Sequence, residues 1–139
     1  MNFLDKNKIS FNIIEPSVEY IDEYNIELLY NNVNIGHLIF VDIYNDMFYD
    51  YIYDQDIIDC ISKKYDVLRL ITELYINKEY RNNGFGSELL KCFIDNFSNK
   101  STILFACNLD NCICDLYKFY EKFGFKEIND SNYFILDKK

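Results

Sequence analysis

The chain has 139 residues, of which 50% are hydrophobic and 18% aromatic, with a formal net charge of −9 at pH 7. This length suits one domain over residues 1–139, and 4 Gly with 1 Pro exclude a disordered or linker-rich chain. The negative charge disfavours nucleic acid partners and favours an amine-bearing small molecule or a basic protein segment. The sequence carries no apolar run long enough for a membrane span and no signal peptide pattern, so we expect a cytoplasmic protein without membrane contact.

The first half of the chain predicts an antiparallel start. Strands are expected over residues 9–15, 24–30 and 33–43, with Asn31 and Asn32 as the turn of a hairpin. Residues 45–66 are rich in Asp and Tyr, and Ile57, Ile58 and Ile61 predict a short amphipathic helix there. This stretch either recognises a cationic group through carboxylates and aromatic rings or is a solvated acidic loop that caps the sheet.

The second half predicts alternating strands and helices. Strands are expected over residues 68–76, 102–108, 125–128 and 133–136. Apolar residues at helical spacing predict one helix after the first of these strands, through Leu89, Leu90, Phe93, Ile94 and Phe97. A second helix over residues 115–123 follows from Leu116, Phe119, Tyr120 and Phe123.

A pair of glycines separates the strand over residues 68–76 from the helix that follows. Gly84 and Gly86 allow backbone angles closed to other residues, so successive N–H groups can turn toward an anion at the helix start. The ligand expected at this loop is a pyrophosphate group. A Walker loop is disfavoured because Ser87 and Glu88 follow the last glycine, and a dinucleotide fold is disfavoured because a third glycine is missing.

The segment Arg81-Asn82-Asn83-Gly84-Phe85-Gly86 resembles the core signature of the GNAT superfamily of N-acetyltransferases. A second landmark, residues 119–125, is similar to the run that closes the last core helix of that family. The resemblance covers residues 68 to about 136. It implies the GNAT fold, an α/β fold whose mixed, mostly antiparallel central sheet is flanked by helices, with a splayed strand pair that binds acetyl-CoA. The family's helices between the first two strands have only residues 17–23 available here.

The resemblance also implies which residues bind acetyl-CoA. Backbone groups at the end of the central strand would bond the pantetheine arm and polarise the thioester carbonyl, at Leu74, Tyr75 and Ile76. The loop N–H groups would bind the pyrophosphate, from Asn82, Asn83, Gly84, Phe85, Gly86 and Ser87. Arg81 would either contact phosphate or brace the loop, and it forms a basic mouth with Lys78 and Lys91. The family's cofactor-binding asparagine aligns with Ile113, so Asn111 or Asn108 is the expected substitute.

Two side chains are candidates for proton transfer. Tyr120 matches the family's tyrosine and would protonate the departing thiolate, although it also fits a core aromatic position. Glu73 is the candidate base, because a carboxylate within an apolar strand needs a cleft or a partner. An ordered water would be the other base, and a register shift of one residue would put Thr72 in the place of Glu73.

The implied function is an acyltransferase that moves the acetyl group of acetyl-CoA to a primary amine of a small molecule or protein by direct transfer. The alternative is a non-catalytic GNAT-like domain that binds a basic partner protein. Acetylation of a charged tRNA conflicts with the acidic balance. No metal is expected, because the five cysteines fit no zinc pattern and His37, the single histidine, is assigned a structural role. An oligomer remains possible.

Overall fold

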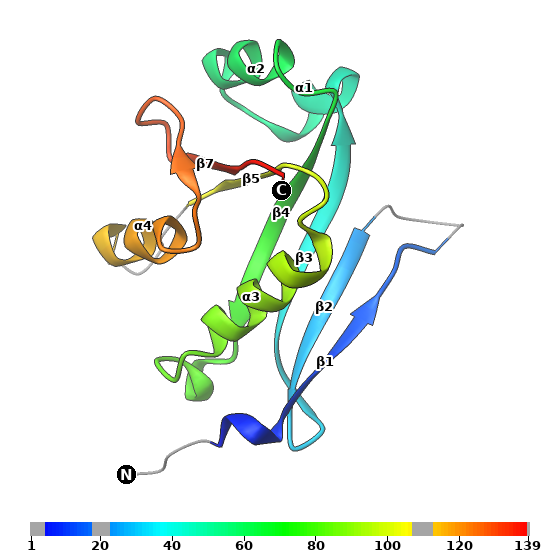
Figure 1. Cartoon of the computed structure of the whole chain (residues 1–139), viewed down its shortest axis with the longest axis vertical. Coiled ribbons are helices and arrows are strands. Elements are labelled where there is room, and N and C mark those ends of the chain that lie inside the picture. Colours follow the sequence, from blue (N-terminus) through cyan, green and yellow to red (C-terminus); the bar gives the residue numbers. More distant parts are fainter. Residues whose placement is uncertain (1–4, 18–22, 107–112, 139) are drawn as a thin grey trace. The chain divides into compact units, whose positions relative to one another are not determined.

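The computed structural model describes residues 5–17, 23–106 and 113–138 (Figure 1). Its strands form one mixed, mostly antiparallel sheet in the order β1-β2-β3-β4-β5-β7-β6, which confirms the predicted α/β fold class. The chain divides into two compact units, Met1–Val41 with Thr72–Phe97 and Asp42–Ile71 with Ser98–Lys139. The assignment of residues 1–139 to one domain stays a prediction. Among the described helices, none has the length and hydropathy of a membrane span.

The first unit is built on an antiparallel meander. A single 3-10 turn, η1 (Lys6–Lys8), precedes β1 (Ile9–Ile14), which pairs with β2 (Glu23–Tyr30). The predicted hairpin to β3 (Val33–Tyr44) is confirmed, and its two turn residues have positive φ values, 50° at Asn31 and 64° at Asn32. Asn tolerates this left-handed conformation better than most residues do, and it is typical of two-residue hairpin turns.

Helix α3 (Phe85–Phe97) covers this unit on the side of Phe40. The rings of Phe40 and Phe93 meet edge to face, with centroids 4.9 Å apart. The predicted apolar helix face is confirmed in its central residues, because Leu89, Leu90 and Phe93 are fully buried. Burial of such side chains stabilises the unit by about 2 kcal/mol each, so α3 holds a fixed place behind the glycine loop.

The second unit starts with three short helical segments, η2 (Asn45–Met47), α1 (Phe48–Tyr51) and α2 (Gln55–Ser62). The Asp54 side chain caps α2 by accepting a hydrogen bond from the Ile57 amide at 3.2 Å. The predicted helix is confirmed, with Ile57, Ile58 and Ile61 buried at 1%, 4% and 2% exposure. The chain then enters β4 (Val67–Ile76), whose first half pairs in parallel with β5 (Thr102–Phe105).

The C-terminal elements complete the second unit. They are α4 (Ile113–Glu121), β6 (Lys126–Glu127) and β7 (Tyr133–Leu136), with β7 antiparallel to both β5 and β6. Most predicted bounds differ from the observed ones by one to three residues. The strand expected over residues 102–108 ends at Phe105, and the helix expected over residues 115–123 spans Ile113–Glu121. Gly124 follows the helix with a φ of +97°, which is the left-handed conformation that terminates helices.

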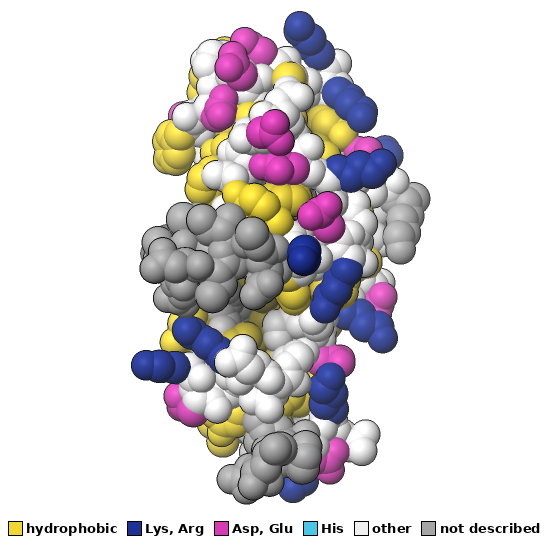
Figure 2. Space-filling view, turned by 90° about the vertical axis from the view of Figure 1, so that its left-hand side faces the viewer, with side chains coloured by type: hydrophobic (Ala, Val, Ile, Leu, Met, Phe, Trp, Pro, Cys, Tyr) yellow, Lys and Arg dark blue, Asp and Glu magenta, His cyan; other side chains and the backbone are white. Residues whose placement is uncertain are grey.

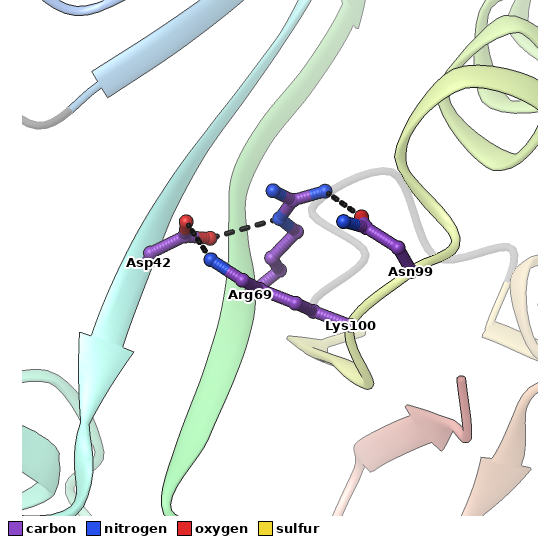
Figure 3. A network of polar contacts seen from close by, with 4 residues as sticks. All are labelled: Asp42, Arg69, Asn99 and Lys100. Atoms are coloured by element: carbon purple, nitrogen blue, oxygen red, sulfur yellow. Dashed lines mark hydrogen bonds and ion pairs between the residues drawn. The ribbon is translucent and has the colours of Figure 1, made fainter.

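A buried polar network fixes the start of β4 (Figure 3). Arg69 is 5% exposed, and its Nε donates to Asp42 Oδ1 on β3 at 2.9 Å while Nη1 donates to Asn99 Oδ1 at 3.0 Å. Lys100 Nζ donates to the other oxygen of Asp42 at 3.0 Å. The network ties β4 to β3 and to the segment before β5. It therefore fixes the register of the parallel pair.

Candidate active site

The glycine loop presents a run of amide groups without acceptors. The loop follows β4 and the 3-10 turn η3 (Lys78–Tyr80), and Gly84 has a φ of +80° and Asn82 a φ of 65°. Within the described part of the chain, the backbone N–H groups of residues 82–87 donate to no acceptor, and Glu88 makes the first helical bond, to Gly84. Unsatisfied N–H groups at the start of a 13-residue helix form an anion site, so the loop fits the predicted diphosphate.

Arg81 connects this loop to the end of β4. Its Nε donates to the Ile76 carbonyl at 2.8 Å, and its guanidinium lies 5.4 Å from the centre of the Tyr75 ring. The Asn83 side chain adds two bonds, to the carbonyls of Tyr80 at 3.1 Å and Arg81 at 2.9 Å. The bond to Ile76 fits the bracing role predicted for Arg81, and its contact with phosphate stays a prediction. These bonds hold the loop open in the conformation in which its N–H groups are free.

Lys6 lies beside the loop, a contact that no pattern in the sequence indicated. Its Nζ lies 3.0 Å from the point that a Cβ on Gly84 would occupy and 3.6 Å from Glu88 Oε1. The ammonium group neutralises the one carboxylate in the first turn of α3, which would otherwise repel a phosphate. Lys78 and Lys91, predicted for the basic mouth, are exposed side chains of η3 and α3.

The end of β4 carries the residues predicted to hold the thioester. Pairing with β5 runs from Arg69–Thr102 to Ile71–Leu104 and then stops, so Leu74, Tyr75 and Ile76 lie beyond the last described pair. Their binding to the pantetheine arm stays a prediction. On the other side, β3 approaches closely at Gly36, where a Cβ would lie 2.5 Å from the Tyr75 carbonyl oxygen. Only glycine fits this contact.

Glu73 has a partner that the sequence did not indicate. Its side chain is 51% exposed, and Oε1 lies 3.2 Å from Nε2 of His37 on β3. The imidazole also stacks on Tyr75, with ring centroids 5.6 Å apart. Thr72 bonds the Ile39 carbonyl through its hydroxyl at 3.3 Å instead. Neighbouring strand residues face opposite sides of a sheet, so Glu73 and not Thr72 meets the imidazole. His37, expected to be structural, therefore stands next to the candidate base.

Tyr120 lies in α4 within an aromatic cluster. It is 8% exposed, and its ring lies 5.2 Å from Phe119, 5.8 Å from Phe125 and 6.1 Å from Phe134, measured between centroids. Burial raises the pKa of the Tyr120 phenol to about 12. The phenol therefore stays protonated throughout the neutral range, as a proton donor must. This packing is compatible with both predicted roles of Tyr120, that of a core aromatic residue and that of a proton donor.

The remaining predicted positions carry less information. Asn111 and Asn108 lie outside the described residues. The described free cysteines are Cys60, which is exposed, and Cys92, which is partly buried, and the described residues form no cluster of metal-ligating side chains.

The acidic stretch over residues 45–66 has two strongly exposed tyrosines, Tyr53 at 87% and Tyr49 at 63% exposure. Figure 2 shows acidic side chains gathered around hydrophobic ones in the upper part of the view, which is the α1–α2 end in Figure 1.

A cavity of about 450 Å³ lies elsewhere in the second unit. Its lining comes from the segments before β4 and β5 and after β7, and includes Lys64, Lys100, Asp137 and Lys138. Tyr65 donates a hydrogen bond to Asp137 there, and burial together with this carboxylate raises the pKa of the Tyr65 phenol well above its usual range. The cavity contains no residue predicted for the cofactor or for proton transfer, so the chemistry is not assigned to it.

A family model and several solved structures match this chain. A family model described as "Acetyltransferase (GNAT) domain" matches residues 43–127, which is more than half of the chain. No curated protein matches the chain. Many solved structures do.

The structure is similar to that of NAA60 from Arabidopsis thaliana in complex with acetyl-CoA, with 16% identity, a TM-score of 0.61, and coverage of 93% of this chain and 98% of that one. It is also similar to the PaiA N-acetyltransferase of Thermoplasma acidophilum in complex with coenzyme A, with 21% identity, a TM-score of 0.51, and coverage of 86% and 62%.

A third similar structure is AtaT in complex with acetyl-methionyl-tRNAfMet, with 11% identity, a TM-score of 0.58, and coverage of 93% and 94%. At these identities the likeness is one of fold. Together with the family match over residues 43–127, it means that the chain belongs to the GNAT acetyltransferase family.

Proposed function

We propose that this protein is an acetyl-CoA-dependent N-acetyltransferase that acts on a primary amine by direct transfer. The observation that carries the proposal is the run of acceptor-free N–H groups at residues 82–87, which comes after η3 and after the end of β4 that lies beyond the last described pair with β5. That pair of features matches the diphosphate and thioester ends of one cofactor. The nearby ammonium of Lys6 adds positive charge where the phosphates would lie.

Each of these residues has its own role in binding the cofactor or in transferring a proton. The N–H groups of the glycine loop and Lys6 bind the diphosphate, and the backbone of Leu74–Ile76 orients the acetyl group and stabilises charge on its carbonyl oxygen. Glu73 contributes to removing the amine proton. Tyr120, which keeps its proton at neutral pH, protonates the thiolate that leaves. The acceptor is a primary amine, and the net charge of −9 favours one that is cationic overall.

The first test is calorimetric titration of acetyl-CoA into the purified protein and into a Gly84→Glu variant. We expect binding by the wild type and its loss in the variant, because the new carboxylate fills the anion site and repels the diphosphate. S-acetylpantetheine, which lacks the diphosphate, should bind both proteins equally. A folded wild type that binds no acetyl-CoA would contradict the proposal.

The second test concerns Tyr120. Tyr120→Phe keeps the aromatic packing and removes the proton donor, so we expect kcat to fall by about 100-fold while acetyl-CoA affinity is unchanged. The assay follows CoA release in the presence of lysine, spermidine and a peptide with a free N-terminus. Unchanged kcat with all acceptors that react would remove Tyr120 from the mechanism and leave it as a core residue.

A second candidate function is binding of a basic partner protein through the acidic, tyrosine-rich stretch. The strong exposure of Tyr53 and Tyr49 within one short stretch favours it, because exposed apolar groups that gather in one patch mark interaction sites. The test is binding of a lysine- and arginine-rich peptide to wild type and to an Asp50→Asn, Asp56→Asn, Tyr53→Ala variant. Asp54 is kept, because it caps α2. Binding that survives the triple change, or that is lost in Tyr120→Phe, would contradict this function.

A further inference from the structure

A histidine and a glutamate face each other on neighbouring strands of the first unit. Nε2 of His37 on β3 lies 3.2 Å from Oε1 of Glu73 on β4. The imidazole is also stacked on Tyr75, with an angle of 28° between the ring planes. Glu73 and Tyr75 are two residues apart in the strand and so face the same side of the sheet. His37 is thus held against both, beside the strand end proposed to carry the thioester.

The two nitrogens of this imidazole have different surroundings. Nε2 is buried and makes no aligned hydrogen bond, and the Glu73 carboxylate is its acidic neighbour. Nδ1 is not buried in this way, and it has no hydrogen-bond partner among the described residues. The Glu73 carboxylate favours the tautomer with its proton on Nε2 by its charge rather than by an aligned hydrogen bond, which leaves the lone pair on Nδ1. A base for the attacking amine needs such a lone pair on an accessible nitrogen.

A second carboxylate stands close to His37 and needs to be considered. Glu27 on β2 is the direct cross-strand partner of His37. Both of its oxygens are already used, since Oε1 accepts from Asn12 Nδ2 at 2.9 Å and Oε2 accepts from Asn34 Nδ2 at 3.0 Å. Glu73 has no such hydrogen bonds among the described residues. Glu73 is therefore the carboxylate available to orient the imidazole.

We propose that His37 is the general base of the acetyl transfer and that Glu73 is its positioning residue, an inference that rests on the proposed function. As the amine attacks the thioester carbonyl and the C–N bond forms, Nδ1 of His37 takes a proton from the attacking nitrogen. The imidazolium then faces the Glu73 carboxylate through its Nε2–H. The C–S bond breaks, and the thiolate takes a proton from Tyr120. Solvent then removes the proton from His37 and returns one to the Tyr120 phenolate.

The kinetic test compares His37→Ala, Glu73→Gln and a control, Thr72→Val, which changes the next position of β4. We expect His37→Ala to lower kcat by about 100-fold or more with KM for acetyl-CoA unchanged, and added imidazole to restore part of the rate. Glu73→Gln should lower kcat by about 10-fold, as loss of an orienting group does. Thr72→Val should leave kcat unchanged. A His37→Ala variant with normal kcat, or a loss that imidazole does not rescue, would overturn the inference.

A spectroscopic test needs no acceptor. His37 is the only histidine of the chain, so its ring nitrogen signals are unambiguous. We expect the neutral imidazole of the wild type to carry its proton on Nε2, and Glu73→Gln to give a mixture of both tautomers. A wild type with the proton on Nδ1 would overturn the inference. Failure of the proposed function looks different, because the wild type itself would then bind no acetyl-CoA.

Discussion

Lys6 and Glu88 are joined at the mouth of the glycine loop, although 82 positions separate them in the chain. Their charged groups lie 3.6 Å apart, and Lys6 Nζ also lies next to Gly84. The pair places one cation and one anion where a diphosphate is proposed to bind. Because the phosphate competes with Glu88 for the same ammonium group, the two residues should affect cofactor affinity in opposite directions.

Lys6→Met should therefore weaken acetyl-CoA binding by about 5-fold, as loss of one partly exposed charge contact does. Glu88→Gln should strengthen binding by about 2- to 5-fold, because it removes a negative charge and releases Lys6. Lys8→Met removes a neighbouring charge in the same 3-10 turn and is the control. Titration calorimetry measures all three. Equal weakening by the first two changes would show a merely structural pair.

Gly84 and Gly124 offer a matched comparison, because both have positive φ, +80° and +97°. Alanine at either site should cost about 1 to 2 kcal/mol of unfolding free energy, since a Cβ disfavours this conformation. Gly84→Ala should in addition weaken acetyl-CoA binding, because its Cβ would press on Lys6 at 3.0 Å. Gly124→Ala should leave binding unchanged. Chemical denaturation and calorimetry separate the two effects, and equal loss of affinity in both variants would contradict the role of the loop.

The buried Arg69–Asp42 pair predicts a large effect on stability. Asp42→Asn should lower the free energy of unfolding by about 3 to 5 kcal/mol, because Arg69 would keep its charge in a buried place with a weaker partner. Replacing both together, as Arg69→Met with Asp42→Leu, should cost less. Asp95→Asn, at an exposed position of α3, is the control and should change stability by at most about 0.5 kcal/mol. Urea denaturation measures each, and a double variant less stable than Asp42→Asn would refute the argument.

Tyr120 predicts a loss of stability in alkali. Its pKa is raised by burial from 10.0 to about 12. The unfolded chain loses this proton near pH 10 while the folded chain keeps it, so the stabilisation is complete below pH 10 and is lost as pH rises toward 12. The loss amounts to about 2 to 3 kcal/mol. Tyr120→Phe should lack this part of the decline. Tyr65, whose pKa is also raised, acts in the same direction in both proteins and cancels in the comparison.

The sequence by itself determined the parts of the protein that depend on local pattern. The hairpin at Asn31 and Asn32, the apolar face around Leu89 and the short helix at Ile57 all follow from periodicity and turn chemistry, and the structure has them. The glycine loop was equally predictable, because its proposed function rests on backbone N–H groups whose conformation glycine permits. Helix and strand ends were less accurate, since Gly124 and the turn at Asn129 and Asp130 end elements that propensity alone would continue.

Only the tertiary structure decided which side chains meet. Lys6 and Gly84, His37 and Glu73, and Arg69 and Asp42 are far apart in sequence, and each pair is brought together by strand pairing or helix packing. A side chain's partner across a sheet depends on register, and a shift of one residue would have turned Thr72 instead of Glu73 toward the imidazole. No short turn joins β3 to β4, so turn chemistry does not specify the register between these two strands. For this reason the sequence predicted the glycine loop as the cofactor site, whereas the proposed base emerged only from the fold.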